Sequence, residues 1–316
     1  MKGECETFET AMPGRVLPPS VAGHECWEQI DAVVCINMDD QPERWAKFQE
    51  RMAGVIPAEK LHRLSAVVGR QIAGYGERPW FTARTGERSR HWAHGAGCLL
   101  SHRDALRLAR DKGWANVLIM EDDAVPEVTA EGMSALGKAL RELRGKWLLY
   151  LGYVDPPTPS GARLWQQGPS SLWLLGGALA LHAYMVPASM YAPLLAALPE
   201  RHEDVWRWMA QHRAIDNFFR NEVVEWRGVR VYGLLPLMYY QEYFYARHAG
   251  GAVAEPGKTL RLSSRVVYPR TWGGLFRMLH CLGSPLRRLW YLLNSCRTYW
   301  LCRRAGFRGK TRGLKL

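Results

Sequence analysis

Apolar residues recur along the chain in short runs that predict buried strands separated by helices. The run AVVCIN at 32–37 is rich in β-branched residues, as is typical of a buried strand. An acidic turn follows, and Pro42 then suits the first turn of a helix. Within that helix Trp45, Phe48 and Met52 recur at i, i+3 and i+7, which is the spacing of one helical face. The same pattern predicts further strands at 61–67, 116–120, 147–152 and 177–186.

The segment 101–113 has the punctuation of a helix. Ser101 is expected to cap its start, Asp104 to complete a capping box, and Gly113 to close it. The preceding segment, 69–90, is rich in Gly, Arg and aromatic residues and is typical of a long loop. Alternating strands and helices predict an α/β fold with a mostly parallel sheet covered by helices. In such sheets, ligands bind beyond the carboxyl ends of the strands.

Composition divides the chain into a nearly neutral part and a basic part. Its 316 residues, 47% of them hydrophobic, suffice for a sizeable core. Of the 42 Lys and Arg residues, 14 lie in 256–316, which has no Asp or Glu. Residues 1–255 therefore hold 42 − 14 = 28 bases against 30 acids. We expect a leader at 1–30, a globular domain at 31–255 and a basic extension at 256–316.

Cysteine usage and hydropathy predict a cytoplasmic protein. The seven cysteines are odd in number and follow no framework spacing, so we expect reduced thiols. The first 23 residues contain early acids and no apolar core of a signal peptide. No stretch reaches the roughly 18 apolar residues of a membrane span.

Three consecutive acids, Glu121, Asp122 and Asp123, follow the predicted strand at 116–120. Like charges repel, so the cluster calls for a partner. Carboxylates after a strand can hold a hard divalent cation that bridges nucleotide phosphates. They are also often solvated or cap the next helix, and the residues alone leave both interpretations open. Asn37 ends the first strand and is expected at the same edge of the sheet.

Several segments occur in the order and near the spacing of glycosyltransferase family 25. They are INMDDQPERWAKFQ, RLSAVVGRQI, GAGCLLSHRDALRLARDKGWANVLIMEDDAVP, WLLYLG, HAYMVP and AIDNFF. The chain resembles this family over about 36–241; its members include bacterial lipooligosaccharide β-galactosyltransferases, which act in lipopolysaccharide biosynthesis, and collagen galactosyltransferases. The resemblance implies a GT-A fold and a UDP-sugar donor, usually UDP-galactose. It also implies Mn²⁺ or Mg²⁺ as the metal, and transfer with inversion to an acceptor hydroxyl.

The resemblance also assigns roles to residues. It places Glu121 and Asp123 as metal ligands and matches Asp216 to an aspartate of the family, which we interpret as the catalytic base. His248 is a candidate third ligand from its own segment, ARHAGG. The residues expected on the donor side are Asn37, Arg44, Gly97, Ser101, His102 and Asp122, with Cys98 in the same GC..SH block. The chain departs from the family where Asp39, Asp40 and Gln41 precede its Pro-x-Arg and where Val68 replaces an aspartate.

Each assignment has an alternative. Asp216 can instead cap a helix, and Glu203 and Asp204 compete for the role of base. His102 can be a structural, hydrogen-bonded histidine, and His248 a solvated loop histidine. The donor sugar can be glucose or an N-acetylhexosamine, and an inactive membrane-binding paralogue is the alternative from a different class.

The basic extension has two apolar stripes at helical spacing on either side of a Gly-Ser-Pro break. The stripes are Trp272, Leu275, Phe276 and Leu279, then Leu286, Leu289, Trp290 and Leu293. Unopposed basic charge beside Trp and Leu favours an anionic membrane surface, where a lipid-linked acceptor is presented. Packing on the catalytic domain is the alternative. No nucleic-acid-binding module accompanies the charge.

We predict that 256–316 hold the protein on the inner face of a membrane. Each base near an anionic surface is worth about 1 kcal/mol, so vesicle binding should rise with anionic lipid and weaken with salt. Sedimentation with vesicles, for the full chain and for one ending at residue 255, measures this. Equal binding by both chains would assign the extension to packing.

Overall fold

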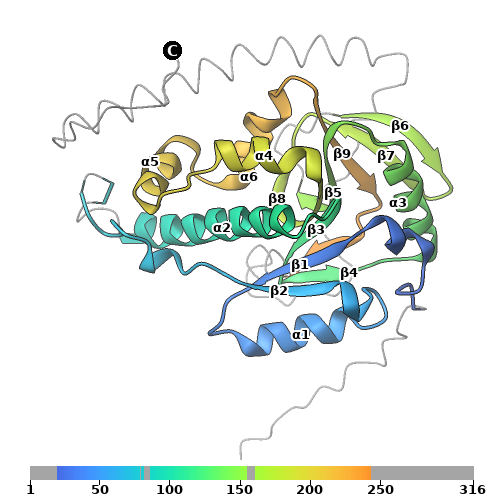
Figure 1. Ribbon diagram of the computed structural model, residues 1–316, viewed down its shortest axis with the longest axis horizontal. Helices are drawn as coiled ribbons and strands as arrows, with labels where there is room; N and C mark the ends of the chain where they lie inside the picture. The colour runs from blue at the N-terminus through green and yellow to red at the C-terminus, as the bar shows by residue number, and fades with distance from the viewer. Residues whose placement is uncertain (1–19, 79, 82–85, 155–160, 243–316) are drawn as a thin grey trace, which may run out of the picture.

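The computed structural model describes residues 20–78, 80–81, 86–154 and 161–242, and it centres on an eight-stranded sheet (Figure 1). Its strands are β1 (Ala32–Asn37), β2 (Leu61–Ser65), β3 (Asn116–Glu121), β5 (Lys146–Val154), β6 (Gly161–Gln167), β7 (Ser170–Leu175), β8 (Leu179–Pro187) and β9 (Val229–Leu235). They lie in the order β2-β1-β3-β8-β5-β9-β7-β6. A second sheet pairs β4 (Ala124–Pro126) with β10 (Tyr239–Gln241).

The large sheet is mixed, but most of its strands run in the same direction. β1 is parallel to β2 and β3, and β5 is parallel to β9. β8 is antiparallel to β3 and β5, and β7 is antiparallel to β6 and β9. All strands of the large sheet except β7 and β8 therefore point the same way. The fold is α/β and Rossmann-like, which confirms the predicted class.

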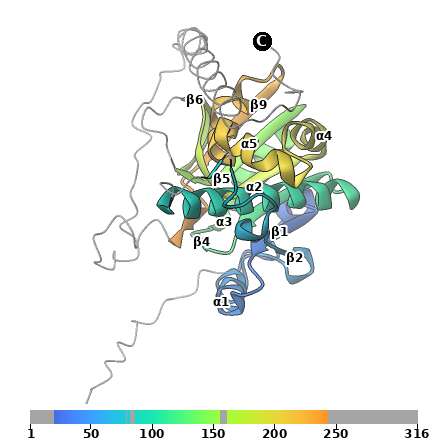
Figure 2. The same ribbon diagram turned by 90° about the vertical axis from the view of Figure 1, so that its left-hand side faces the viewer.

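Helices cover both faces of the sheet, and in Figure 2 β1 and β2 lie between α1 and α2. One layer contains η1 (Glu25–Gln29), α1 (Pro42–Met52) and α3 (Ala130–Glu142). The other contains α2 (Gly86–Asp111), α4 (Ala188–Ala197), α5 (His202–His212) and α6 (Ile215–Asn221). The remaining 3-10 turns are η2 (Ala58–Lys60), η3 (Gly69–Gln71) and η4 (Val223–Glu225).

Two cores form because strand side chains alternate between the faces. In β1, Val34 belongs to the core beneath α2, whereas Val33 and Cys35 belong to the core beneath α1. Both cores are apolar, so β1 is buried along its whole length and appears in the sequence as a continuous apolar run. Phe48 and Met52 are the buried residues of the predicted face of α1.

The backbone of α2 lies in direct contact with the backbone of η3 and of the residues just before it. A Cβ on Gly69 would lie 1.7 Å from the carbonyl oxygen of Ala93, and one on Gly97 would lie 2.5 Å from that of Val67. The Ser101 hydroxyl accepts a hydrogen bond from the Val67 amide at 2.8 Å and donates to the Gly97 carbonyl at 2.7 Å. Glycine at both contact points therefore lets α2 lie directly against the segment that follows β2.

The prediction that a helix begins at Ser101 is wrong, because α2 begins at Gly86 and continues through that residue. The Ser101 hydroxyl bonds the carbonyl of the preceding turn, as serine does within helices. Asp104 completes no capping box, and its carboxylate instead pairs with Arg107 at 3.1 Å. Gly113 does close the helix in the left-handed conformation, with φ of 70°. The predicted loop at 69–90 contains η3 and the first turn of α2.

The other predicted strands lie within a few residues of their observed ends, but five observed strands were not predicted. These are β4, β6, β7, β9 and β10. β6 and β7 form an antiparallel hairpin at one edge, where polar and apolar residues mix. No described helix combines the length and the apolar character needed to cross a bilayer. The amphipathic helices predicted for 256–316 lie outside the described residues.

Candidate functional site

The carboxyl ends of β1 and β3 bring Asn37 and the three acids together. The two strands are parallel neighbours, with Ile36 paired to Glu121. Asn37, the last residue of β1, consequently lies beside the turn after β3, and its Nδ2 donates to Asp122 Oδ2 at 2.7 Å. Both side chains are buried. The predicted convergence at this edge of the sheet is therefore observed.

Asp122 is ion-paired with an arginine and accepts a hydrogen bond from an amide. Arg44, in the first turn of α1, pairs directly with Asp122 Oδ1 and lies 4.0 Å from Asp123 Oδ2. Arg63, from β2, donates from Nε to Asn37 Oδ1 at 2.8 Å, and so orients the amide toward Asp122. A buried carboxylate is stable only when it is paired and hydrogen-bonded. Asp122 thus fastens β3 to β1 and α1.

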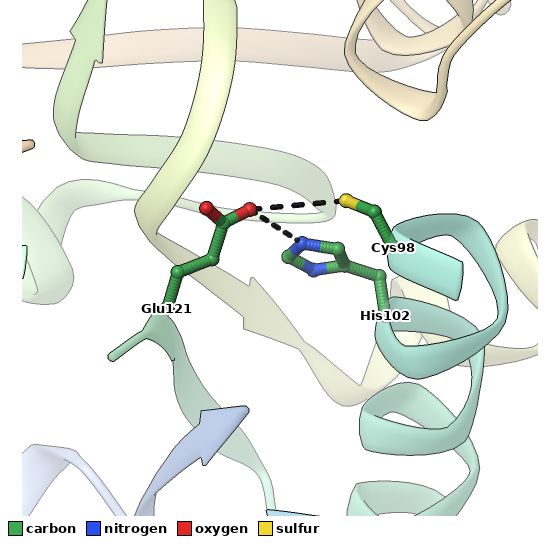
Figure 3. Close-up of side chains that lie close together, drawn as sticks. All are labelled: Cys98, His102 and Glu121. Atoms are coloured by element: carbon green, nitrogen blue, oxygen red, sulfur yellow. Dashed lines mark hydrogen bonds and ion pairs between the residues drawn. The ribbon is translucent and has the colours of Figure 1, made fainter. Parts of the chain in front are cut away.

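Glu121 faces α2. Its Oε1 lies 3.2 Å from His102 Nε2 and 3.8 Å from Cys98 Sγ (Figure 3). The other ring nitrogen of His102, Nδ1, lies 3.0 Å from the Tyr184 hydroxyl. Both nitrogens of this fully buried ring therefore have protein partners, as the structural alternative for His102 requires.

Asp123 is the acid with the least compensation. Gln241, from β10, donates from Nε2 to Asp123 Oδ2 at 3.2 Å and to Glu121 Oε2 at 3.3 Å. Asp123 Oδ1 is buried and has no hydrogen-bond partner in the described chain. Burial and the charge of Glu121 raise the pKa of Asp123 to about 7, despite the opposing charge of Arg44.

The pKa of Glu121 moves in the opposite direction. Burial alone would raise it, but the hydrogen bond and charge of His102, with the charges of His182 and His94, lower it below its usual range. Adjacent carboxyls whose pKa values are pushed apart are typical of functional sites, although ion-pair networks also produce them.

The donor set of Glu121 and Asp123 fits a hard divalent cation. One oxygen of each carboxylate lies within 3.3 Å of a single atom, Gln241 Nε2, so the two oxygens converge on one point. Gln241 Oε1 and Asp123 Oδ1 are buried without a partner among the described residues. Turning the amide of Gln241 round would place Oε1 at the same point. Carboxylate and amide oxygens are the ligands that such cations take.

Asp216 lies in the first turn of α6, but Ala214 is the residue at the cap position. Its carboxylate accepts hydrogen bonds from the amides of Asn217 at 2.6 Å and Ala180 at 3.3 Å. Burial raises the pKa of the Cys98 thiol, and the charges of Glu121 and then Asp216 raise it further. The charges of Glu121 and Asp216 therefore both act on the Cys98 thiol.

The competing acids are engaged elsewhere. Asp204 pairs with Arg201 at 3.0 Å and Arg207 at 2.7 Å on α5, and Glu203 lies 3.8 Å from Arg201. Neither carboxylate contacts the acid cluster in the described structure. The predicted third metal ligand, His248, lies outside the described residues.

Sequence reasoning missed three residues that complete the cluster: Gln241, Arg63 and Tyr184. Each reaches the site from a strand far away in the chain, namely β10, β2 and β8. A single glutamine or tyrosine in a strand carries no local signal of such a contact. Arg63 lies within the strand expected at 61–67, and that strand was the one available indication.

The chain has no match among protein-family models and none among curated proteins. Among solved structures it is similar to mannose-1-phosphate geranyltransferase from Thermus thermophilus. The two are 13% identical, and the match covers 65% of this chain and 74% of that one with a TM-score of 0.32. A likeness at this level carries no functional argument, so membership of glycosyltransferase family 25 stays a prediction.

The raised pKa of Asp123 predicts how stability changes with pH. The pKa of Asp123 is 3.8 in the unfolded chain and about 7 in the folded chain. Between these values the folded protein binds more protons than the unfolded chain, so this residue makes the free energy of unfolding fall as pH rises. Asp123→Asn should flatten that fall in urea unfolding of the metal-free protein. Glu59→Gln, at an exposed position, is the control, and equal slopes in both variants would contradict the assignment.

Proposed function

We propose that this protein is an inverting glycosyltransferase of the GT-A type, which moves a hexose, galactose in the first instance, from a UDP-sugar to a saccharide hydroxyl. The observation that supports it most is the convergence of Glu121 and Asp123 on one point beyond the carboxyl end of β3. Rossmann-like sheets bind nucleotides at this edge. Hard cations held by such carboxylates bridge nucleotide phosphates.

Glu121 and Asp123 would hold the divalent metal, which would offset the charge that builds on the departing UDP. Arg44 pairs with Asp122 and Asn37 hydrogen-bonds to it, which would leave the outer acids to the metal. Both residues would lie on the donor side of the same edge. Arg44 is partly exposed and can also reach a phosphate oxygen.

Asp216 is the proposed general base. It would accept the proton of the acceptor hydroxyl as that oxygen attacks the anomeric carbon opposite the UDP. The amides of Ala180 and Asn217 fix the orientation of the carboxylate. Its charge acts on the Cys98 thiol of α2 together with that of Glu121, which supports a role beside the acid cluster.

The choice of donor sugar rests on the family resemblance, and glucose or N-acetylhexosamine donors use the same chemistry. A screen of UDP-sugars for Mn²⁺-dependent UDP release identifies the donor. The proposed acceptor, a saccharide carried on a lipid at the inner face of a membrane, rests on the basic extension.

The metal assignment predicts that UDP release disappears with a chelator and returns with Mn²⁺. Asp123→Ala should abolish it without lowering the thermal unfolding midpoint, because the fold then loses a buried carboxylate that has one unpartnered oxygen and a raised pKa. Glu59→Ala, an exposed acid outside the cluster, is the matched control. Full activity of the chelated enzyme would contradict the assignment.

The base assignment predicts a loss of turnover without a loss of donor binding. Asp216→Asn keeps the shape of the side chain but removes the proton acceptor, so kcat should fall by about 10²- to 10⁴-fold. Donor affinity, measured by UDP titration, should change little. Unchanged kcat, or a variant that fails to fold, would make Asp216 a structural residue that holds the Ala180 amide.

A further inference from the structure

A thiol and an imidazole on α2 face the same oxygen of Glu121. Cys98 and His102 are four residues apart on the helix and so lie on one face. Cys98 Sγ is 3.8 Å and His102 Nε2 is 3.2 Å from Glu121 Oε1. The three ligand atoms lie within 4.8 Å of one another, and Figure 3 shows the side chains pointing toward a common centre.

The two separations from Glu121 Oε1 are close to those between the ligands of a tetrahedral zinc ion. Zinc–sulfur, zinc–nitrogen and zinc–oxygen bonds of about 2.3, 2.0 and 2.0 Å place sulfur about 3.5 Å and nitrogen about 3.3 Å from the oxygen. The observed 3.8 and 3.2 Å differ from these values by a few tenths of an ångström. Small side-chain movements would therefore convert the hydrogen-bonded cluster into a coordination shell.

We propose that Cys98, His102 and Glu121 form a binding site for Zn²⁺, distinct from the hard-cation position between Glu121 and Asp123. A thiolate and an imidazole favour Zn²⁺ over Mn²⁺ or Mg²⁺. On binding, the Cys98 thiol releases its proton to water as the zinc–sulfur bond forms. Three protein ligands leave the fourth position to a water molecule.

The surroundings support the ligands. When His102 binds through Nε2, its Nδ1–H donates to the Tyr184 hydroxyl 3.0 Å away, which fixes the ring as partners of zinc-bound histidines do. The ring is completely buried, whereas Cys98 and Glu121 are partly exposed, so an ion can enter from their side.

Zinc at this site would act on the proposed transfer reaction, and this consequence rests on the proposed function. Glu121 directs Oε1 toward Cys98 and His102, and Oε2 toward Gln241 and Asp123. An ion on Oε1 draws the carboxylate toward α2 and weakens its hold on the hard cation. We therefore expect Zn²⁺ to inhibit Mn²⁺-dependent UDP release.

Cobalt is the probe for the site because it takes the same ligands as zinc and is coloured. The full chain, first stripped of metal by a chelator, should bind Co²⁺ with the near-ultraviolet absorption of a cobalt–thiolate bond. Cys98→Ala and Cys98→Ser should both lose this absorption, and His102→Gln should weaken cobalt binding at least tenfold. Excess Zn²⁺ should abolish the absorption in the parent chain.

Two matched variants test whether the signal belongs to this site. Cys35→Ala removes a buried thiol on the other face of β1, and Asp123→Asn removes the neighbouring acid; both should retain the absorption. Thermal unfolding of every variant establishes that it is folded. A cobalt–thiolate absorption that survives in folded Cys98→Ser, or that is absent from the parent chain, would overturn the proposal.

Inhibition is measured separately, as the ratio of UDP release with and without Zn²⁺ at fixed Mn²⁺. The ratio should be well below one for the parent chain and close to one for Cys98→Ser, each compared with its own zinc-free rate. Equal ratios would overturn the inhibitory role. The cobalt absorption is measured without enzyme activity. It therefore tests the zinc site independently of the glycosyltransferase proposal.

Discussion

Mutual repulsion among three consecutive carboxylates is the constraint around which this structure is organised. Each acid is stabilised by a different part of the fold. Asp122 contacts Arg44 of α1 and Asn37 of β1. Glu121 contacts His102 of α2. Asp123 accepts a hydrogen bond from the amide of Gln241 in β10. Charges buried this closely would destabilise the edge of the sheet without such partners. The cluster therefore forms only when four separate elements have reached their final positions.

α2 links this cluster to the rest of the fold as one rigid element. Gly97 lies against the backbone of Val67, and the next residue, Cys98, faces Glu121. One turn later Ser101 holds the Val67 amide while its neighbour His102 reaches Glu121. Along α2, residues that contact Val67 and fix the position of the helix alternate with residues whose side chains contact Glu121. A larger residue at Gly69 or Gly97 would push α2 away from this contact, and would thus move Cys98 and His102 together.

The sequence predicts the parts of this arrangement that depend on short-range patterns. The continuous apolar run of β1, Pro42 at the start of α1 and the acids after β3 each indicate their own structure, and the class of fold follows from their alternation. Ser101 shows where this fails, since a serine that caps a helix and one that bonds within it look alike in sequence. The role of Gln241 could not be predicted for a different reason: its strand, β10, pairs with β4, which is more than a hundred residues away in the chain.

The small sheet of β4 and β10 has its own consequence for the acids. Gln241 pairs with Ala124, one residue beyond Asp123, and this register places an uncharged donor between two carboxylates. A slip of β10 by one residue would put Tyr240 or Glu242 at that position instead. Glu242 would bring a further negative charge and would abandon Lys47 and Arg51, with which it now pairs. Electrostatic repulsion thus penalises the slip that would bring Glu242 to the acids, in a strand of only three residues.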